Sequence, residues 1–265
     1  MQPRPDAWKP SQYDKFRAER ERPFHDLLAF VRRVPGMRVV DLGCGTGKLT
    51  RELHERLTAS RTLGIDSSEA MLAGTGEFQA EGLRFQRATI ESFGSGPEFD
   101  LVFSNAALHW VPDHESLLAR LARSLTPRGQ LAIQVPANED HAAYRIANEV
   151  AREEPFRTAL GGFLHRSSVL APESYALILE RLGFAECQVR LNVYVHRLPS
   201  VDAVVEWVKG AMLTDFESRL APARYAEFVA RYRERILSAF PPESPTLFTF
   251  KRILLWGTLE DASTS

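Results

Sequence analysis

Short apolar runs alternate with segments of helical periodicity through the first half of the chain. The runs hold four to six residues, and their mostly continuous apolar character is typical of strands buried on both faces of a parallel sheet. After the first run, Leu49, Leu53 and Leu57 recur at helical spacing. This alternation predicts a parallel sheet covered by helices on both faces. The strands expected in this half are 38–42, 62–65, 83–86, 99–103 and 130–135.

The second half of the chain is less regular but still carries strand and helix patterns. A helical pattern ends at Gly183, a residue type that commonly follows the last turn of a helix. Apolar residues then alternate over 187–195, which predicts a strand with one buried face. Together with a late apolar strand, this brings the expected sheet to seven strands. The remaining expected elements are helices 173–182, 201–209 and 224–240 and the strand 248–259.

These elements predict three parts of the chain. At the start, Phe24, Leu27 and Leu28 follow Pro23 at helical spacing, and proline is tolerated in a first helical turn. This helix should run to about Arg33. We expect the helices near the end to form a lid, because ligands bind at the loops along a sheet edge in such folds. The expected parts are an N-terminal helical cap (1–34), a sheet core (35–198 and 246–265) and a helical lid (199–245).

The glycine-rich turn after the first expected strand is the most informative segment. Gly43, Gly45 and Gly47 recur at every second position after Asp41, and this pattern lets the backbone approach a ligand closely. A phosphate-binding P-loop would need a glycine where Leu42 stands. The dinucleotide fingerprint Gly-x-Gly-x-x-Gly would need a third glycine where the chain has lysine. The spacing therefore disfavours a nucleotide hydrolase and a nicotinamide-dependent oxidoreductase.

An acidic residue stands at the end of the second expected strand. Asp66 lies about twenty residues past the last glycine, where a carboxylate would accept hydrogen bonds from a ribose diol. A helix N-cap is the alternative role for Asp66. Ser67 and Ser68 follow it, and either could cap a helix that contains Met71 and Leu72.

Composition excludes several classes of protein. The chain has 265 residues with 33 basic and 34 acidic side chains, a net charge of -1, which is not the basic balance of a general nucleic-acid binder. Two cysteines allow no disulfide framework or cysteine zinc cluster, and the seven histidines show no metal-ligand spacing. We expect no metal and no nucleic-acid partner. The chain shows no transmembrane run and no signal peptide, so we expect a cytoplasmic protein with no membrane partner.

The glycine turn resembles motif I of the class I S-adenosylmethionine-dependent methyltransferases, and further segments are similar to the trans-aconitate methyltransferase family. The similarity is dense to about Ala137 and recurs in patches to the C terminus. The resemblance implies a Rossmann-like class I methyltransferase fold and S-adenosylmethionine as cofactor. The segments are WKPSQY (8–13), AERERP (18–23), GIDSS (64–68), NAALHWVPDH (105–114), QVPAN (134–138), YVH (194–196), LPS (198–200) and EWV (206–208).

The resemblance also implies which residues form the site. The expected cofactor-binding residues are Arg20, Asp41, Gly43, Gly45, Gly47, Asp66, Ser67, Met71, Thr89, Ile90 and Asn105. The expected residues around the acceptor are Tyr13, Arg22, His109, Trp110, His196 and Trp207. Core packing remains an alternative for Trp110 and Trp207.

Two segments depart from the family pattern. Thr89 stands where an Asp commonly accepts from the adenine amino group, so the backbone of Ile90 would have to contribute. Thr214-Asp215 stands where the family often has an Arg-Pro pair. An anion there would disfavour a tricarboxylate such as trans-aconitate. The cations that the chain can offer to such an acid are Arg20, Arg22, Lys251 and Arg252.

The predicted function is methyl transfer to a small molecule, with carboxyl O-methylation of a small organic acid favoured by the resemblance. A carboxylate is ionised at neutral pH and needs no general base, so no catalytic residue is assigned. A phenol or amine acceptor would want a base, for which His109 or His196 is the candidate. Methylation of another small metabolite at oxygen, nitrogen or carbon, and cofactor binding without catalysis, remain alternatives.

Overall fold

The computed structural model describes residues 17–94, 96–210 and 212–260, with side chains from residue 21 on. Within these ranges the chain divides into two compact units. The sheet unit comprises Arg17–Ala137, Ser168–Asn192 and the chain from Arg252 on. The helical unit comprises Asn138–Ser167 and Val193–Lys251. Of the expected cap (1–34), residues 1–16 lie outside the described residues, and the part from Arg17 on belongs to the sheet unit and not to a separate cap.

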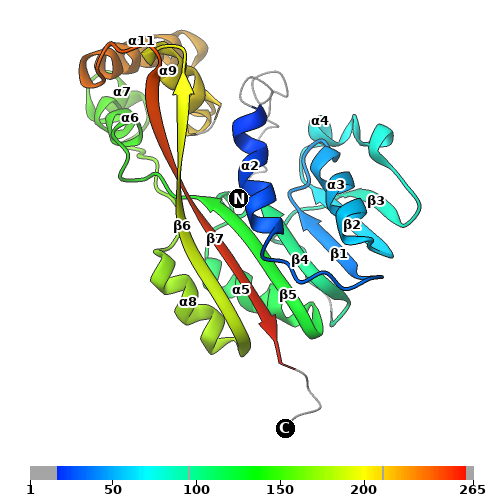
Figure 1. The fold of residues 1–265 in the computed structure, drawn as a ribbon. Helices are drawn as coiled ribbons and strands as arrows, with labels where there is room; N and C mark the ends of the chain where they lie inside the picture. Colours follow the sequence, from blue (N-terminus) through cyan, green and yellow to red (C-terminus); the bar gives the residue numbers. More distant parts are fainter. Residues whose placement is uncertain (1–16, 95, 211, 261–265) are drawn as a thin grey trace. The chain divides into compact units, whose positions relative to one another are not determined.

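The sheet has seven strands in the order β3-β2-β1-β4-β5-β7-β6, which confirms the predicted, mostly parallel sheet (Figure 1). Strands β1 to β5 pair in parallel, whereas β7 runs antiparallel to β5. Between β1 and β4 the order of the strands reverses direction, and ligands of such sheets bind at this point, outside the carboxyl ends of the strands. The strands are β1 Arg38–Leu42, β2 Arg61–Asp66, β3 Leu83–Arg87, β4 Phe99–Asn105, β5 Leu125–Pro136, β6 Phe184–Leu198 and β7 Thr246–Leu259.

Each face of the sheet buries its own apolar cluster. On one face, helices α2 (Arg17–Leu28) and α3 (Lys48–Leu57) pack on side chains such as Phe103 and Leu254. On the other face, α5 (His114–Arg123) and α8 (Pro172–Arg181) pack on side chains such as Ile133. Figure 1 shows these helices against the sheet. Successive residues of a strand point to opposite faces of the sheet, so residues two apart share a face. Each residue at a strand end therefore faces either α2 and α3 or α5 and α8.

Helix α2 differs from the helix predicted over 23–33. It begins at Arg17 and ends at Leu28, with Pro23 inside it and not in its first turn. The helix ends here because a side chain of β5 forms hydrogen bonds with the backbone groups that follow it. Gln130 Oε1 accepts from the Arg32 backbone N–H at 2.8 Å, and Gln130 Nε2 donates to the Arg32 carbonyl at 2.8 Å. The amide side chain thus replaces the helical hydrogen bonds that would have continued α2.

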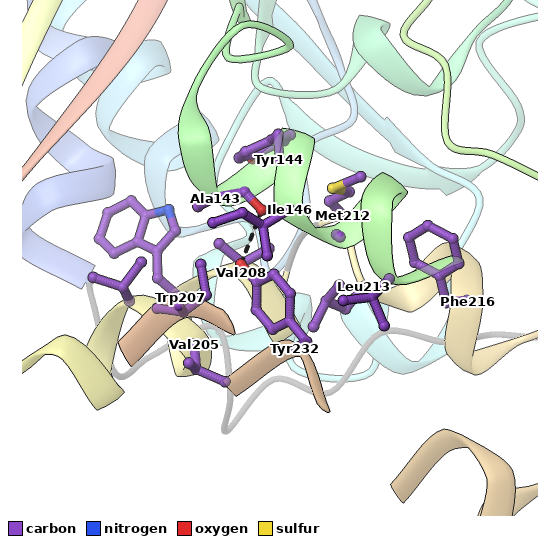
Figure 2. Packing of buried hydrophobic residues seen from close by; sticks show 14 of the residues in the cluster. Ala143, Tyr144, Ile146, Val205, Trp207, Val208, Met212, Leu213, Phe216 and Tyr232 are labelled. Carbon is purple, nitrogen blue, oxygen red and sulfur yellow. Dashed lines mark hydrogen bonds between the residues drawn. The ribbon is translucent and has the colours of Figure 1, made fainter. Parts of the chain in front are cut away.

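The helical unit contains α6 (Ala142–Arg152), α7 (Phe156–Ala159), α9 (Val201–Lys209), α10 (Thr214–Glu217) and α11 (Pro222–Ala239). Their buried side chains form one cluster, part of which Figure 2 shows. The Tyr232 hydroxyl of α11 donates to the Ala143 carbonyl of α6 at 3.1 Å. The unit therefore reaches beyond the expected boundaries 199–245, because α6, which the sequence pattern did not predict, packs against α9 and α11. The role of these helices as a lid stays a prediction.

The short helices and turns complete the element order. They are α4 (Glu69–Leu72) and the 3₁₀ turns η1 (Thr75–Phe78) and η2 (Leu108–Trp110). The Ser68 hydroxyl caps α4 by accepting from the Met71 N–H at 3.1 Å, as the serine pair predicted.

A partly buried ion cluster joins three segments of the helical unit. His165 Nδ1 lies 2.8 Å from an Asp215 carboxylate oxygen, and Nε2 lies 3.8 Å from Glu139. Arg219 lies 3.9 Å from the other Asp215 oxygen. Burial lowers the pKa of His165, but the two carboxylates outweigh burial and raise this pKa to about 9. His165 is therefore a cation at neutral pH, and it balances the charge of Asp215.

The ion cluster makes the stability of the helical unit depend on pH. Because the folded pKa of His165 lies above the ordinary value of 6.5, its contribution is complete below pH 6.5 and is lost as the pH rises to about 9. We expect His165→Gln to lower the free energy of unfolding by about 3 kcal/mol at pH 6 and to have little effect above pH 9. Urea unfolding of both proteins across this pH range measures the difference.

The matched control is His25→Gln. His25 Nε2 lies 3.0 Å from Glu52 on the surface of α2 and α3, with a side chain 40% exposed. An exposed pair of this kind contributes little to stability. A stability loss in His165→Gln that is the same at pH 6 and pH 9 would contradict the assigned charge.

Candidate active site at the carboxyl edge of the sheet

The glycine turn and the acidic strand end lie together, as the sequence predicted for neighbouring parallel strands. Asp66, at the end of β2, accepts from the Gly45 N–H through Oδ2 at 2.9 Å and from the Ser68 N–H through Oδ1 at 2.9 Å. The backbone N–H groups of Gly43 and Cys44 both donate to the Ile65 carbonyl, at 2.8 and 2.9 Å. The turn after β1 is thus fixed to the end of β2 by backbone and side chain together.

The three glycines of the turn have different neighbours although all have positive φ angles. A Cβ at Gly43 would lie 2.1 Å from the Cβ of Ala107, and one at Gly47 would lie 2.8 Å from the ring of Phe85. At Gly45, with φ at +57°, no described heavy atom would lie within 4 Å of an added Cβ. Gly43 and Gly47 are therefore required by protein packing, whereas Gly45 presents bare backbone to open space.

Asp41 is buried beneath the glycine turn. Its side chain is 5% exposed and accepts from the Thr50 hydroxyl at 2.6 Å. Burial raises the pKa of Asp41 to about 7, against the lowering effect of the Thr50 hydrogen bond, and the nearby charge of Asp66 raises it further. Thr50 was not expected from the sequence. A hydroxyl side chain on an amphipathic helix that faces the sheet is the only feature that could have indicated a partner for Asp41.

The ends of β2 and β3 place the remaining expected cofactor residues around the turn. Ser67 is exposed and Met71 is buried at the start of α4. The Thr89 hydroxyl lies on the exposed turn after β3 and bonds to Ser92, with its Oγ1 accepting from the Ser92 N–H at 3.2 Å. A methyl carbon of Ile90 would lie 3.9 Å from a Cβ at Gly43. The structure thus brings Ile90 to the glycine turn, while Thr89 already makes local hydrogen bonds.

The segment after β4 carries Asn105, His109 and Trp110 into the same region of the sheet unit. The rings of His109 and Trp110 are half-buried, with centroids 4.6 Å apart. His114 anchors this segment: its Nε2–H donates to the Leu108 carbonyl at 3.0 Å, so its Nδ1 accepts from the Tyr175 hydroxyl. Burial lowers the pKa of His114, which keeps the ring in the neutral form that this arrangement needs.

Other expected site residues lie elsewhere or outside the described part. Tyr13 and the side chain of Arg20 lie outside the described residues, and Arg22 is exposed on α2. Glu21 of α2 nevertheless lies beside the end of the glycine turn, because its carboxylate accepts from Lys48 Nζ at 2.6 Å. His196 and Trp207 belong to the helical unit. Their rings are 4.7 Å apart and buried with those of Phe248 and Phe250.

The two late cations also differ. Lys251 bonds to Asp140 with a partly exposed side chain. Arg252 is 4% exposed, and its guanidinium donates to Gln134 Oε1 at 3.1 Å. Sequence reasoning did not select Gln134, although a glutamine near the carboxyl end of an apolar strand is an unusual residue for a sheet interior.

The described residues contain no group of three or more His, Cys, Asp or Glu side chains that could hold a metal ion. None of the described helices combines the length and the apolar composition needed to cross a bilayer.

The residues at this edge suit S-adenosylmethionine. Gly45 offers bare backbone that any larger side chain would cover. The Asp66 carboxylate lies beside this backbone, and a carboxylate oxygen can accept more than one hydrogen bond, so Asp66 can also accept from a ribose hydroxyl. Two carboxyl groups, those of Asp41 and Asp66, also suit a ligand that carries positive charge.

Comparison with known proteins identifies the class of enzyme. Residues 40–133 match the family described as "Methyltransferase domain". A trans-aconitate 2-methyltransferase from Deinococcus radiodurans is 43% identical over 95% of this chain and 98% of its own length. A trans-aconitate 2-methyltransferase from Methylobacterium nodulans is 40% identical over 94% of this chain and 96% of its own length.

Solved structures support the same fold. The YcgJ protein from Bacillus subtilis matches with a TM-score of 0.57 and 18% identity, over 90% of this chain and all of that chain. Phosphoethanolamine N-methyltransferase 2 from Haemonchus contortus, solved with S-adenosylmethionine, matches with a TM-score of 0.55 and 17% identity, over 91% of this chain and 53% of that chain. The protein is an S-adenosylmethionine-dependent methyltransferase with the class I Rossmann-like fold, and by its near full-length similarity to these relatives the chain belongs to the trans-aconitate 2-methyltransferase family.

Proposed function

We propose that this enzyme methylates a carboxyl oxygen of a small organic acid, either trans-aconitate or an acid of the same kind. The observation that carries this proposal is the 43% identity, over 98% of its length, to a protein named trans-aconitate 2-methyltransferase. Such an acceptor is ionised at neutral pH and attacks without a general base.

The enzyme's task in such a reaction is positioning. S-adenosylmethionine supplies an electrophilic methyl group on a sulfonium sulfur, and the carboxylate oxygen must lie about 3 Å from that carbon in line with the breaking bond. Residues of the sheet unit hold the two ligands in this geometry and exclude water. The helical unit is the candidate lid for this exclusion.

The charge of Asp215 does not oppose a tricarboxylate acceptor. Its presence in the sequence had predicted that trans-aconitate would be a poor substrate. In the structure, His165 is a cation 2.8 Å from Asp215, and Arg219 lies 3.9 Å away. Because this anion is balanced within the helical unit, the expected repulsion loses its basis, and trans-aconitate becomes the first substrate to try.

The residues that the sequence predicted for the cofactor site would contribute to it in different ways. Gly45 contributes bare backbone, Asp66 accepts from the ribose, and Ile90 lies against the adenine. Gly43 and Gly47 act through packing of the turn, Asp41 and Met71 lie beneath it, and Ser67 and Asn105 flank it.

Thr89 is a weak partner for adenine because its hydroxyl already bonds to Ser92. His109 and Trp110 are the acceptor-side candidates of the sheet unit.

Gly45→Ala tests the proposed backbone contact. A methyl group at this position meets no protein atom within 4 Å but enters the space that the cofactor would occupy. We expect S-adenosylmethionine affinity to fall at least about tenfold, while the positive φ angle costs about 1 kcal/mol of stability. Calorimetric titration and thermal unfolding measure the two effects.

Gly36→Ala is the matched control for Gly45→Ala. Gly36 has φ at +79° and the same open surroundings, but it precedes β1 at the opposite edge of the sheet. It should lose similar stability and keep its cofactor affinity. An undiminished affinity in folded Gly45→Ala would overturn the proposed contact.

Asp66→Ala tests the ribose contact. Loss of a charged hydrogen-bond acceptor should weaken S-adenosylmethionine binding by about 1.5–3 kcal/mol. Since Asp66 also accepts from the Ser68 N–H, the control is Ser68→Ala, which removes the cap of α4 but leaves the carboxylate. The control should lose about 1 kcal/mol of stability and bind the cofactor normally. Equal affinity losses in both variants would refute a direct role for Asp66.

A panel of acceptors tests the function itself. We expect the purified enzyme with S-adenosylmethionine to methylate trans-aconitate faster than a monocarboxylate, and to leave a hydroxylated aromatic unchanged. Mass spectrometry of the product distinguishes an ester from an ether. Turnover of the phenol alone would overturn the carboxylate proposal and would point to a histidine base such as His109.

A further inference from the structure

Three polar residues form a row at the carboxyl edge of the sheet, on the face that α2 and α3 cover. Asn105 ends β4 and pairs in register with Gln134 of β5. Gln134 pairs with Leu254 of β7, and Arg252 lies two residues from Leu254 on the same face. Leu254 belongs to the apolar cluster under α2 and α3, so the whole row faces these helices.

Gln134 has a fixed orientation and an unused donor. Its side chain is fully buried, and its Oε1 accepts from the Arg252 guanidinium at 3.1 Å. Because Arg252 can only donate, the amide oxygen must face it, and the amide NH₂ must point away from it. This Nε2 has no hydrogen-bond partner among the described residues. A buried donor without a partner is costly and calls for an explanation.

The unused donor is not a general property of glutamine on this strand. Gln130 lies four residues earlier on the same face. Its Oε1 accepts from Trp256 Nε1 at 3.0 Å and from the Arg32 N–H, and its Nε2 donates to the Arg32 carbonyl. The strand therefore carries one glutamine whose amide groups are satisfied by the fold and one whose NH₂ group has no partner among the described residues.

We propose that Arg252 and Gln134 together bind a carboxylate group of the methyl acceptor. The guanidinium and the amide NH₂ are two donors on neighbouring strands, and a carboxylate accepts from such a pair with charge assistance. Asn105 lies beside Gln134 and completes the row, and its buried Oδ1 also has no hydrogen-bond partner among the described residues. This inference rests on the proposed function, since it assigns that acceptor a binding site.

The order of the strands assigns the pair to the acceptor and not to the cofactor. Most residues proposed for the cofactor stand at or after the ends of β1, β2 and β3, on one side of the point where the strand order reverses, and Asn105 of β4 borders this point. Gln134 and Arg252 stand on β5 and β7, on the other side of this point and beyond β4. Four inter-strand spacings, roughly 19 Å, separate the strand of Asp66 from that of Arg252.

Arg252→Met tests the pair, because methionine fills much of the same space without a charge. With trans-aconitate as acceptor and S-adenosylmethionine as donor, we expect KM for the acid to rise about 100-fold, as for a lost charged hydrogen bond. The dissociation constant of S-adenosylmethionine should stay within about threefold. Arg181→Met is the matched control, since it makes the same substitution at a surface arginine of α8, on the other face of the sheet, which bonds to Glu115. This control should leave KM for the acid within about threefold of the wild-type value.

Gln134→Glu keeps the contact to Arg252 as an ion pair and so provides a second variant that preserves the buried packing. Its carboxylate replaces the donor by an anion, and KM for trans-aconitate should rise by a similar factor at pH 8 with cofactor affinity unchanged. Gln134→Met removes the donor without adding charge, and its KM should rise less.

The outcomes separate the inference from the proposed function. A wild-type enzyme that methylates trans-aconitate, with Arg252→Met and Gln134→Glu leaving KM unchanged, would overturn the inference and leave the function standing. A loss of S-adenosylmethionine affinity in both variants would assign the pair to the cofactor's carboxylate and overturn the inference as well. A wild-type enzyme that methylates no carboxylic acid would overturn both.

Discussion

One carboxylate holds the active edge of the sheet in shape. Asp66 accepts from the backbone of the glycine turn through one oxygen and from the start of α4 through the other, at 2.9 Å each. The backbone N–H groups of Gly43 and Cys44 also donate to the Ile65 carbonyl, so three hydrogen bonds tie the turn after β1 to the end of β2. The bare backbone at Gly45 is presented from this fixed turn.

The sheet is the part of the fold that could be predicted from the sequence, because its strands follow simple patterns of apolar residues. All seven strands were expected, the first five from short apolar runs and the last two from an alternating and an apolar pattern late in the chain. Helix α6 escaped prediction even though Ala143, Ala147 and Val150 are spaced for one helix face. Its partners lie in α9 and α11, far along the chain, so the need for that apolar face is visible only in three dimensions. The end of α2 was misplaced for a similar reason, because Gln130 of β5 satisfies the backbone at Arg32.

The site was predictable by type but not by role. The spacing of three glycines indicated a ligand-binding turn, yet it could not show which glycine is exposed. That distinction depends on Phe85 in β3 and Ala107 in the turn after β4. Counting charges was equally incomplete: Asp215 was expected to repel an anion, but His165, fifty residues earlier, balances it. The role of Gln134 could not be predicted from the sequence, because only its hydrogen bonds in the structure distinguish it from Gln130.

Asp41 has a further consequence for how this enzyme exchanges protons with the solvent. A buried carboxyl group with a pKa of about 7 is half-protonated in a neutral buffer. A positively charged ligand bound at the glycine turn favours the ionised form, so its binding is coupled to the release of a fraction of a proton. The measured heat of such binding then includes the ionisation enthalpy of the buffer, and the apparent affinity increases with pH until Asp41 is fully ionised.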